Sequence, residues 1–286
     1  MRLGVMFDRG LPPERLVPFA KALDDLGGPS GVDDLWVVED LGWAGGVSSA
    51  ATALAVTTRL RVGIGIAPAP LRNPMLLAME LGNLARLHPG RLAAGIGHGV
   101  REWMEQAGAA PASPLALLEE TITSVRALLR GETVTLDGRA VRLDGVSLVH
   151  PPAAAPPVLA GVKGPRSLAL SGRVAQGTIL PEGVGPAQLA EMRGLIGAEG
   201  EHEVVMFTFL GVNLGAGAVE VDRELIAGQA AFLGVAPEDV VMATGTAEEA
   251  AAEVKALAAA GADTVVLRPL DLADPLSHVK ALLSAL

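Results

Sequence analysis

Two glycine-rich segments, each following a short apolar run, constrain the fold of this chain more than any other feature. The first is RLRVGIGIAPAP, which begins at Arg59, and the second is RLAAGIGHG, which ends at Gly99. Between them, Asn73 and Pro74 form a favourable helix start, because an N-cap side chain precedes a proline at the first helical position. The stretch predicts strand, glycine-rich turn, helix, strand and a second glycine-rich turn. Its glycines place bare backbone where a parallel sheet usually binds its ligand.

The same alternation of short apolar strands and helices runs through most of the chain. Strands are expected at 2–7, 34–38, within 59–70, and at 92–96, 158–162, 178–180, 204–213 and 264–267. Eight parallel strands, each followed by a helix, predict a (β/α)8 barrel, which we expect to form one domain over residues 1–286. A doubly wound open sheet split into two domains is the alternative.

The regular alternation stops after the fourth strand, where residues of about 100–156 predict an insertion. Within it, 115–129 has the pattern of an amphipathic helix. The segment TVTLDGRAVRL then places Asp137 and Gly138 between two alternating runs, which is typical of a β-hairpin.

Composition excludes several classes of function. The chain has 22 Lys plus Arg against 32 Asp plus Glu, so its net charge of -10 disfavours binding to nucleic acid or to an anionic membrane. It has no cysteine, and no carboxylate or histidine cluster has metal-ligand spacing. Asp8 comes too early for a secretory signal, and no apolar run approaches the ~20 residues that cross a bilayer. These features predict a soluble, cytoplasmic protein without a metal.

Polar side chains that follow the strands would share one rim of a barrel. Glu39 and Asp40 follow the second strand, as either a carboxylate pair near a ligand or a solvated strand end. His98 lies in the second glycine segment, where it would bind a cofactor, transfer a proton, or cap the next helix.

The segment GVKGPRSLAL has the form of an anion site. Gly164 and Pro165 open a helix whose free N–H groups can receive a phosphate, and Lys163 and Arg166 add positive charge. An ordinary helix start with surface charges is the other interpretation. The segment GIGHG lacks the third glycine and the acidic partner of a dinucleotide fingerprint, so it does not predict nicotinamide binding.

Four segments, in order and spacing, resemble the bacterial-luciferase-like superfamily, the luciferase-like monooxygenases, and especially its branch that uses the deazaflavin coenzyme F420. They are DLWVVED, the whole stretch from RLRVGIG to GIGHGVREWMEQAGA, PPVLAGVKGPRSLALSGRVAQGTILPE, and GADTVVLRPL. The segment GPRSLALSGRVAQGTI is similar to the methylenetetrahydromethanopterin reductase-like group.

The resemblance implies a deazaflavin at the C-terminal rim and hydride transfer between its ring and a small organic substrate. It implies a bulge with a non-prolyl cis peptide behind the ring, at the bond from Gly65 to Ile66. It also implies that Val162 to Pro165 bind the cofactor phosphate. The cofactor-binding residues are then Gly65, Ile66, Ala67, Gly97, His98, Gly99, Gly161, Val162, Lys163, Gly164 and Pro165.

One position departs from the family pattern. Many relatives that use F420 have an acid followed by histidine after the second strand, whereas here Glu39 is followed by Asp40. The candidate catalytic residues are therefore Glu39, Asp40 and His98. FMN remains the alternative cofactor, in a luciferase-like monooxygenase, because both cofactors present a phosphate and a flat tricyclic ring. A flavin-binding barrel without catalysis is the third hypothesis, and a homodimer is expected because the family commonly pairs barrels.

Overall fold

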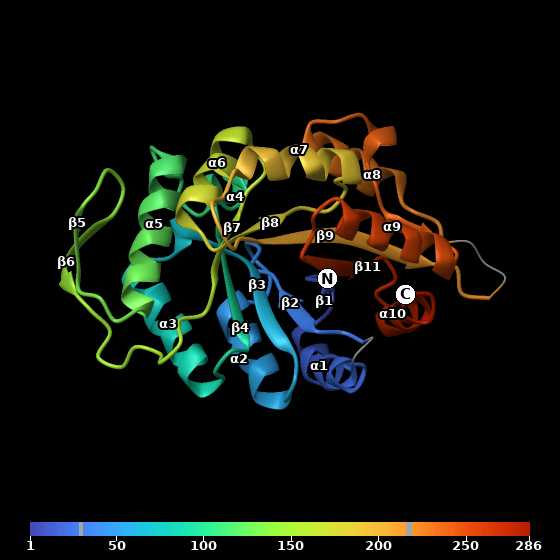
Figure 1. Cartoon of the computed structure of the whole chain (residues 1–286), viewed down its shortest axis with the longest axis horizontal. Coiled ribbons are helices and arrows are strands. Elements are labelled where there is room, and N and C mark those ends of the chain that lie inside the picture. Colours follow the sequence, from blue (N-terminus) through green and yellow to red (C-terminus); the bar gives the residue numbers. More distant parts are fainter. Residues whose placement is uncertain (29–30, 216–218) are drawn as a thin grey trace.

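The computed structural model describes residues 1–28, 31–215 and 219–286, and its centre is a closed barrel of parallel strands (Figure 1). In spatial order the barrel strands are β1 (Arg2–Met6), β2 (Asp34–Val37), β3 (Arg61–Pro68), β4 (Leu92–Gly97), β7 (Val158–Gly161), β8 (Gly177–Leu180), β9 (Glu203–Val212) and β11 (Thr264–Pro269). The sheet closes because β9 pairs with both β8 and β11, and β11 pairs with β1. The predicted (β/α)8 barrel is confirmed, and the doubly wound open sheet is excluded.

Helices cover the outside of the barrel. They are α1 (Leu16–Asp25), α2 (Gly46–Val56), α3 (Pro74–Leu87), α5 (Pro114–Leu129), α6 (Pro165–Val174), α7 (Pro186–Ile196), α9 (Ala247–Ala259) and α10 (Pro275–Leu283), with 3-10 turns η1 (Pro13–Arg15), η2 (Ala69–Leu71) and η3 (Pro237–Asp239). The predicted start of α3 is confirmed, because Asn73 Oδ1 accepts a hydrogen bond of 2.9 Å from Met75 N. Among the described residues, no helix has both the length and the apolar character needed to cross a membrane.

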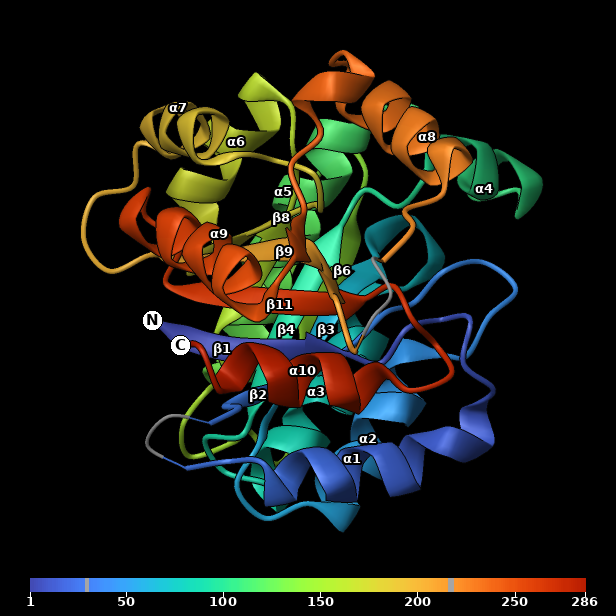
Figure 2. The same ribbon diagram turned by 90° about the vertical axis from the view of Figure 1, so that its right-hand side faces the viewer.

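Two further helices lie where the strands end. Figure 2 shows α4 (Arg101–Gln106) and α8 (Arg223–Leu233) at its right-hand side, beyond the C-terminal ends of the strands. α4 was not predicted, because six residues are too few to show a helical period. The short strand β10 (Ala243–Gly245) was not predicted for the same reason, and it pairs with the end of β9 outside the barrel.

The expected insertion follows β4, and one of its helices also serves the barrel. α5 packs against α3, β4 and α6, so it takes the place of the helix after the fourth strand. The predicted hairpin consists of β5 (Val134–Asp137) and β6 (Arg142–Val146), and it projects beyond α5 at the left of Figure 1. Glu120 on α5 accepts hydrogen bonds from the N–H groups of Arg139, Ala140 and Val141, which fasten the hairpin turn to the helix.

One large aromatic side chain, Trp36, fills the barrel interior and is fully buried. Its ring meets Phe207 edge to face, with centroids 5.5 Å apart. Gly63 and Gly65 face the indole from β3, and a Cβ added at Gly63 would lie 2.3 Å from Trp36 Cδ2. The expectation of a turn at these glycines was wrong, because they lie inside β3 and make room for the indole.

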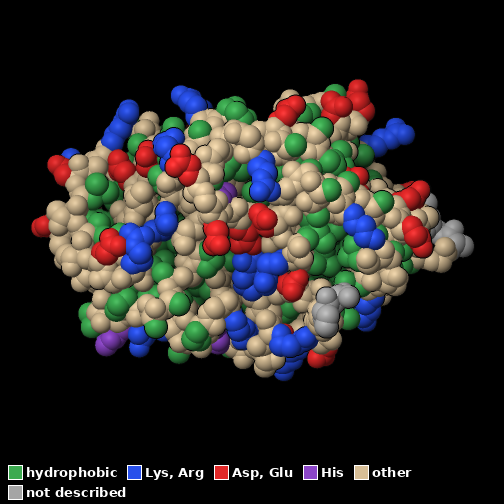
Figure 3. Space-filling view, viewed as in Figure 1, with side chains coloured by type: hydrophobic (Ala, Val, Ile, Leu, Met, Phe, Trp, Pro, Cys, Tyr) green, Lys and Arg blue, Asp and Glu red, His purple; other side chains and the backbone are tan. Residues whose placement is uncertain are grey.

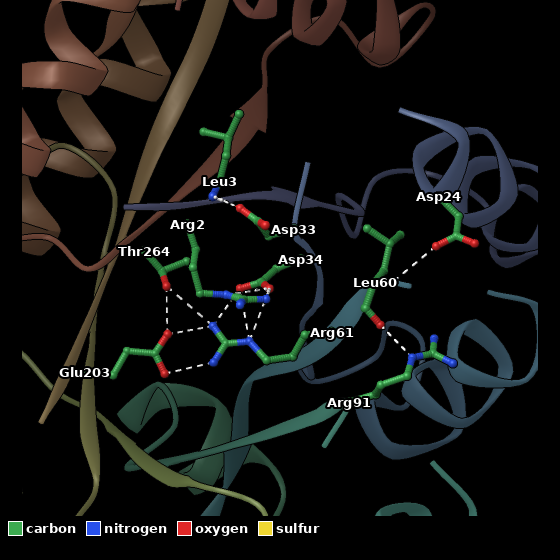
Figure 4. A network of polar contacts seen from close by, with 10 residues as sticks. All are labelled: Arg2, Leu3, Asp24, Asp33, Asp34, Leu60, Arg61, Arg91, Glu203 and Thr264. Carbon is green, nitrogen blue, oxygen red and sulfur yellow. Dashed lines mark hydrogen bonds and ion pairs between the residues drawn. The ribbon is translucent and has the colours of Figure 1, made fainter. Parts of the chain in front are cut away.

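Ion pairs close the N-terminal end of the barrel, which faces the viewer in Figures 1 and 3. Arg61 lies 2.6 Å from both Asp34 and Glu203, and Arg2 also reaches Asp34 (Figure 4). Burial alone would raise the pKa of Glu203, but hydrogen bonds from Arg61 and Thr264 hold that pKa below its ordinary value. These buried charges satisfy one another, so this end of the barrel is structural.

We expect Gly63→Ala to destabilise the fold, because the buried Trp36 has no space into which it can move away from the new methyl group. Such overpacking costs about 1–3 kcal/mol, measured as the free energy of unfolding in urea. The matched control is Gly194→Ala on α7, where a Cβ meets nothing within 4 Å; we expect it to be neutral or stabilising by up to about 1 kcal/mol. Wild-type stability in Gly63→Ala would contradict this packing.

Candidate active site

A cavity of about 470 Å³ opens at the C-terminal end of the barrel. Its apolar floor comes from side chains of the barrel interior, namely Met6, Val38, Ile66, Ile179 and Phe207, and Trp103, Val162 and Phe232 add apolar surface from outside that cluster. Its polar lining comes from Arg9, Glu39, Asp40, His98, Lys163, Glu182, Gln229 and Arg268. The cavity therefore joins an apolar floor to charged and hydrogen-bonding walls.

Ile66 is seated in this floor by glycines of neighbouring strands. The peptide bond from Gly65 to Ile66 is cis, and the register of β3 against β4 shifts between Ile64 and Ala67. A Cβ added at Gly161 would lie 2.3 Å from Ile66 Cγ2, and one at Gly97 would lie 2.9 Å from Ile66 Cγ1. Only glycine at these positions leaves space for the Ile66 side chain.

Glu39 is held by three donors. Arg72 bonds to both of its carboxylate oxygens, through Nε to Oε1 at 2.9 Å and through Nη2 to Oε2 at 2.7 Å. The N–H of Gly46, at the start of α2, donates to Oε2 at 2.7 Å. Arg72 also bonds to Glu80. Glu39 is therefore fixed as a hydrogen-bond acceptor that joins the end of β2 to the start of α2 and to Arg72, which itself pairs with Glu80 of α3.

Asp40 lies beside Arg9 at the cavity wall. Arg9 Nη1 is 2.5 Å from Asp40 Oδ2. The guanidinium carbon of Arg9 lies 4.6 Å from the ring centroid of Trp43 and 5.6 Å from that of Trp103. Both indoles thus help to hold the cation that pairs with Asp40.

His98 connects the end of β4 to α6. Its Nε2 lies 3.0 Å from Ser167 Oγ, while Nδ1 is buried without a hydrogen-bond partner among the described residues. Burial lowers the pKa of His98 below its ordinary value of 6.5, and the nearby carbonyl of Pro114 opposes this only in part. The imidazole is therefore neutral at pH 7.

Lys163 directly precedes Gly164, the N-cap of α6. Its Nζ donates to the carbonyl of Phe232 on α8 at 2.5 Å and lies 4.6 Å from the centroid of the Phe232 ring. Gly164 is the N-cap of α6 and Pro165 its first residue; a Cβ added at Gly164 would meet nothing within 4 Å. The first turn of α6 thus stands open beside an ammonium group.

Arg268 bridges two acidic side chains across the barrel mouth. Its Nε bonds to Asp8 Oδ2 at 2.7 Å and its Nη1 to Glu182 Oε1 at 3.1 Å. Burial alone would lower the pKa of Arg268, but Glu182 and Asp8 raise it. Three strand ends, those of β1, β8 and β11, are joined by this one guanidinium.

Most of the predicted site residues line the cavity: Glu39, Asp40, Gly65, Ile66, His98, Gly99, Gly161, Val162 and Lys163. Ala67, Gly97, Gly164 and Pro165 do not. Ala67 and Gly97 are buried within the sheet, and Gly164 and Pro165 begin α6 beside the cavity. The roles of all these residues stay predictions.

Sequence reasoning missed several lining residues. Arg9 directly follows Asp8, so its position after the first strand was the available signal. Phe207 lies inside β9, a strand in which most residues are apolar, so nothing in its sequence surroundings sets it apart. Gln229 and Phe232 come from α8, and no local pattern showed that this helix covers the mouth.

The family model for luciferase-like monooxygenases matches residues 1–204, which is well over half of the chain. The chain belongs to the luciferase-like monooxygenase family. A 5,10-methylenetetrahydromethanopterin reductase from Methanolobus tindarius is 28% identical over 181 residues, which are 63% of this chain and 54% of that protein. This luciferase-like chain therefore spans about half the length of that curated relative.

Solved structures share the fold over the full length. An F420-dependent secondary alcohol dehydrogenase in complex with an F420-acetone adduct superposes with a TM-score of 0.81 at 18% identity, covering 100% of this chain and 99% of that one. A type II Baeyer-Villiger monooxygenase from Pseudomonas putida in complex with FMN gives a TM-score of 0.73 at 17% identity, covering 99% and 96%. At such identities these likenesses show the fold alone.

We expect His98 to titrate below pH 6.5, because burial disfavours the charged ring. Two-dimensional NMR of the histidine ring protons measures the midpoint, and the spectrum of His98→Gln assigns the signal. The sign follows from the lowered pKa: the ring stays neutral from pH 7 down to the midpoint and gains its proton only below it. A midpoint at or above 6.5 would contradict the burial of the imidazole.

Proposed function

We propose that this protein is an F420-dependent oxidoreductase that transfers a hydride between the deazaflavin and a small organic substrate. The observation that supports it is a cavity that has an apolar floor at Ile66 and an ammonium group at Lys163, with the N-terminus of α6 at Gly164 beside it. A flat ring with a phosphate tail needs both features. Curated relatives named for F420, and a reductase of methylenetetrahydromethanopterin, support the choice of cofactor.

The residues present fit such a cofactor. Ile66 and the backbone of Gly65 would support the ring, and Gly161 and Val162 would border it. Lys163, with the first N–H groups of α6, would bind the phosphate. When bound, the deazaflavin supplies the ring carbon that gives or accepts the hydride.

Within this proposal, Asp40 handles the proton of the substrate. Its Oδ2 faces Arg9, and Oδ1 forms no hydrogen bond to a described residue, so Oδ1 is the atom that takes up or returns the proton. The carboxylate of Glu39 is bonded to Arg72 and Gly46, so we assign Glu39 a positioning role: it holds the end of β2, next to Asp40, in place. Neutral His98 is available to bond a substrate or cofactor oxygen.

We expect the protein to bind F420 more tightly than FMN in fluorescence titrations of each cofactor. Lys163→Met should weaken F420 binding at least about tenfold, because a charge-assisted hydrogen bond to phosphate is lost. Lys255→Met is the matched control. Lys255 lies on α9, and its ammonium group also donates to a backbone carbonyl, that of Ala285. Micromolar or tighter binding of FMN together with no binding of F420 would refute the proposal.

A second candidate is an FMN-dependent monooxygenase. The observation that favours it is the shared fold with the FMN-bound Baeyer-Villiger enzyme. Oxygen consumption with reduced FMN would identify it, because a deazaflavin enzyme gives none. A barrel that binds a flavin without catalysis is the third candidate, and turnover of any substrate by the F420-loaded protein would exclude it.

We also propose that two copies pair through α3. Its side chains Leu76, Met79 and Leu87 are 49%, 52% and 64% exposed, which is unusual for large apolar residues gathered on one helix. Sedimentation velocity should give a dimer, and Met79→Lys should shift the protein to a monomer. A monomeric wild-type protein would contradict this interface.

A further inference from the structure

Three arginines pair with the acidic side chains that follow the barrel strands, and they differ in the number of their acidic partners. Arg268 and Arg72 each bridge two carboxylates. Arg9 has one acidic partner among the described residues, Asp40. Its guanidinium is therefore the least satisfied of the three.

Arg9 is also the arginine best arranged to bind an oxyanion. It packs on Trp43 and Trp103, whose ring centroids are 5.9 Å apart, and a guanidinium stacked on aromatic rings keeps its N–H groups free in its own plane. Nη1 donates to Asp40, and the guanidinium makes no other hydrogen bond to a described residue. The side chain is 32% exposed and lines the cavity.

We infer that Arg9 determines substrate specificity, and that the substrate carries a carboxylate or phosphate group which the free edge of Arg9 binds. This inference rests on the proposed function. A substrate that fills the cavity removes water from the donors of Arg9. A neutral, apolar substrate would leave these donors unpaired, whereas an oxyanion accepts two parallel N–H groups at once.

The same contact would orient the substrate. An oxyanion on the free edge of Arg9 makes Arg9 a bridge between two acidic groups, as Arg72 and Arg268 already are. Asp40 pairs with the same guanidinium, so an oxyanion bound to the remaining N–H groups of Arg9 holds the substrate at the wall of the cavity that also carries Asp40. Arg9 is in this sense a positioning residue.

Tryptophan fluorescence can test the inference, since Trp43 and Trp103 contact Arg9. The probes are lactate, 3-hydroxybutyrate and glycerol 3-phosphate, each compared with its neutral counterpart, which is lactamide, 3-hydroxybutyramide or glycerol. The full chain is titrated without F420 and again with saturating F420. We expect the anionic member of at least one pair to bind at least about tenfold more tightly than the neutral one. The comparison of the two carboxylates with the phosphate identifies which oxyanion fits.

Three variants separate the role of Arg9 from general charge effects. Arg9→Met should lose the preference for anions, and Arg9→Lys, which keeps the charge without the planar fork, should retain part of it. Arg101→Met is the matched control, because Arg101 lies on α4 with a side chain that is 84% exposed and does not line the cavity. Its affinities should equal those of the wild type.

Three results would overturn the inference. The first is equal affinity of the wild type for the anions and their neutral counterparts, and the second is wild-type affinity for the anions in Arg9→Met. The third is a loss of F420 affinity in Arg9→Met that Arg101→Met does not share, because Arg9 would then hold the cofactor. The titrations without F420 do not depend on the cofactor, so failure of F420 to bind removes the proposed function but leaves the result for Arg9 readable.

Discussion

The packing of two large side chains against glycines determines what this barrel can hold. Trp36 occupies the interior only because Gly63 carries no Cβ, and Ile66 lies in the cavity floor only because Gly97 and Gly161 carry none. Protein interiors pack as densely as organic crystals, so a single added methyl group is felt. The glycines that look like ligand-binding loops in the sequence thus first serve the barrel itself. They also shape the cavity, because they seat Ile66 in its floor and because Gly65, Gly99 and Gly161 line it directly.

The ion pairs at the two ends of the barrel differ in whether they leave donors unused. At the N-terminal end, Arg61 is enclosed by Asp34 and Glu203, which it joins through ion pairs of 2.6 Å. At the C-terminal end, arginines fix most of the acids that follow the strands, yet Arg9 and Lys163 keep donors that face the cavity or its mouth. The chain, whose net charge is -10, thus keeps two cations with unused donors at the opening where an anionic cofactor or substrate would enter.

Local patterns in the sequence were enough to predict the fold, but they predicted only part of the candidate site. The alternation of strands and helices, and the Asn73–Pro74 helix start, depend on neighbouring residues and were read correctly. The resemblance to a family placed the cis peptide at Gly65. The contacts of Arg9 with two indoles, and the position of α8 over the mouth, join segments far apart in the chain. Contacts of this kind cannot be predicted from hydrophobic periodicity or residue spacing, so they were found only in the three-dimensional structure.

A crystal structure of the complex with F420 tests the central claim most directly. We predict that the deazaflavin ring lies against Ile66 at the C-terminal end of β3, with its phosphate at Lys163 and the first turn of α6. Asp40 and Arg9 would then face the ring from the substrate side. A ring bound away from Ile66, or a cofactor phosphate held by Arg9, would contradict the claim.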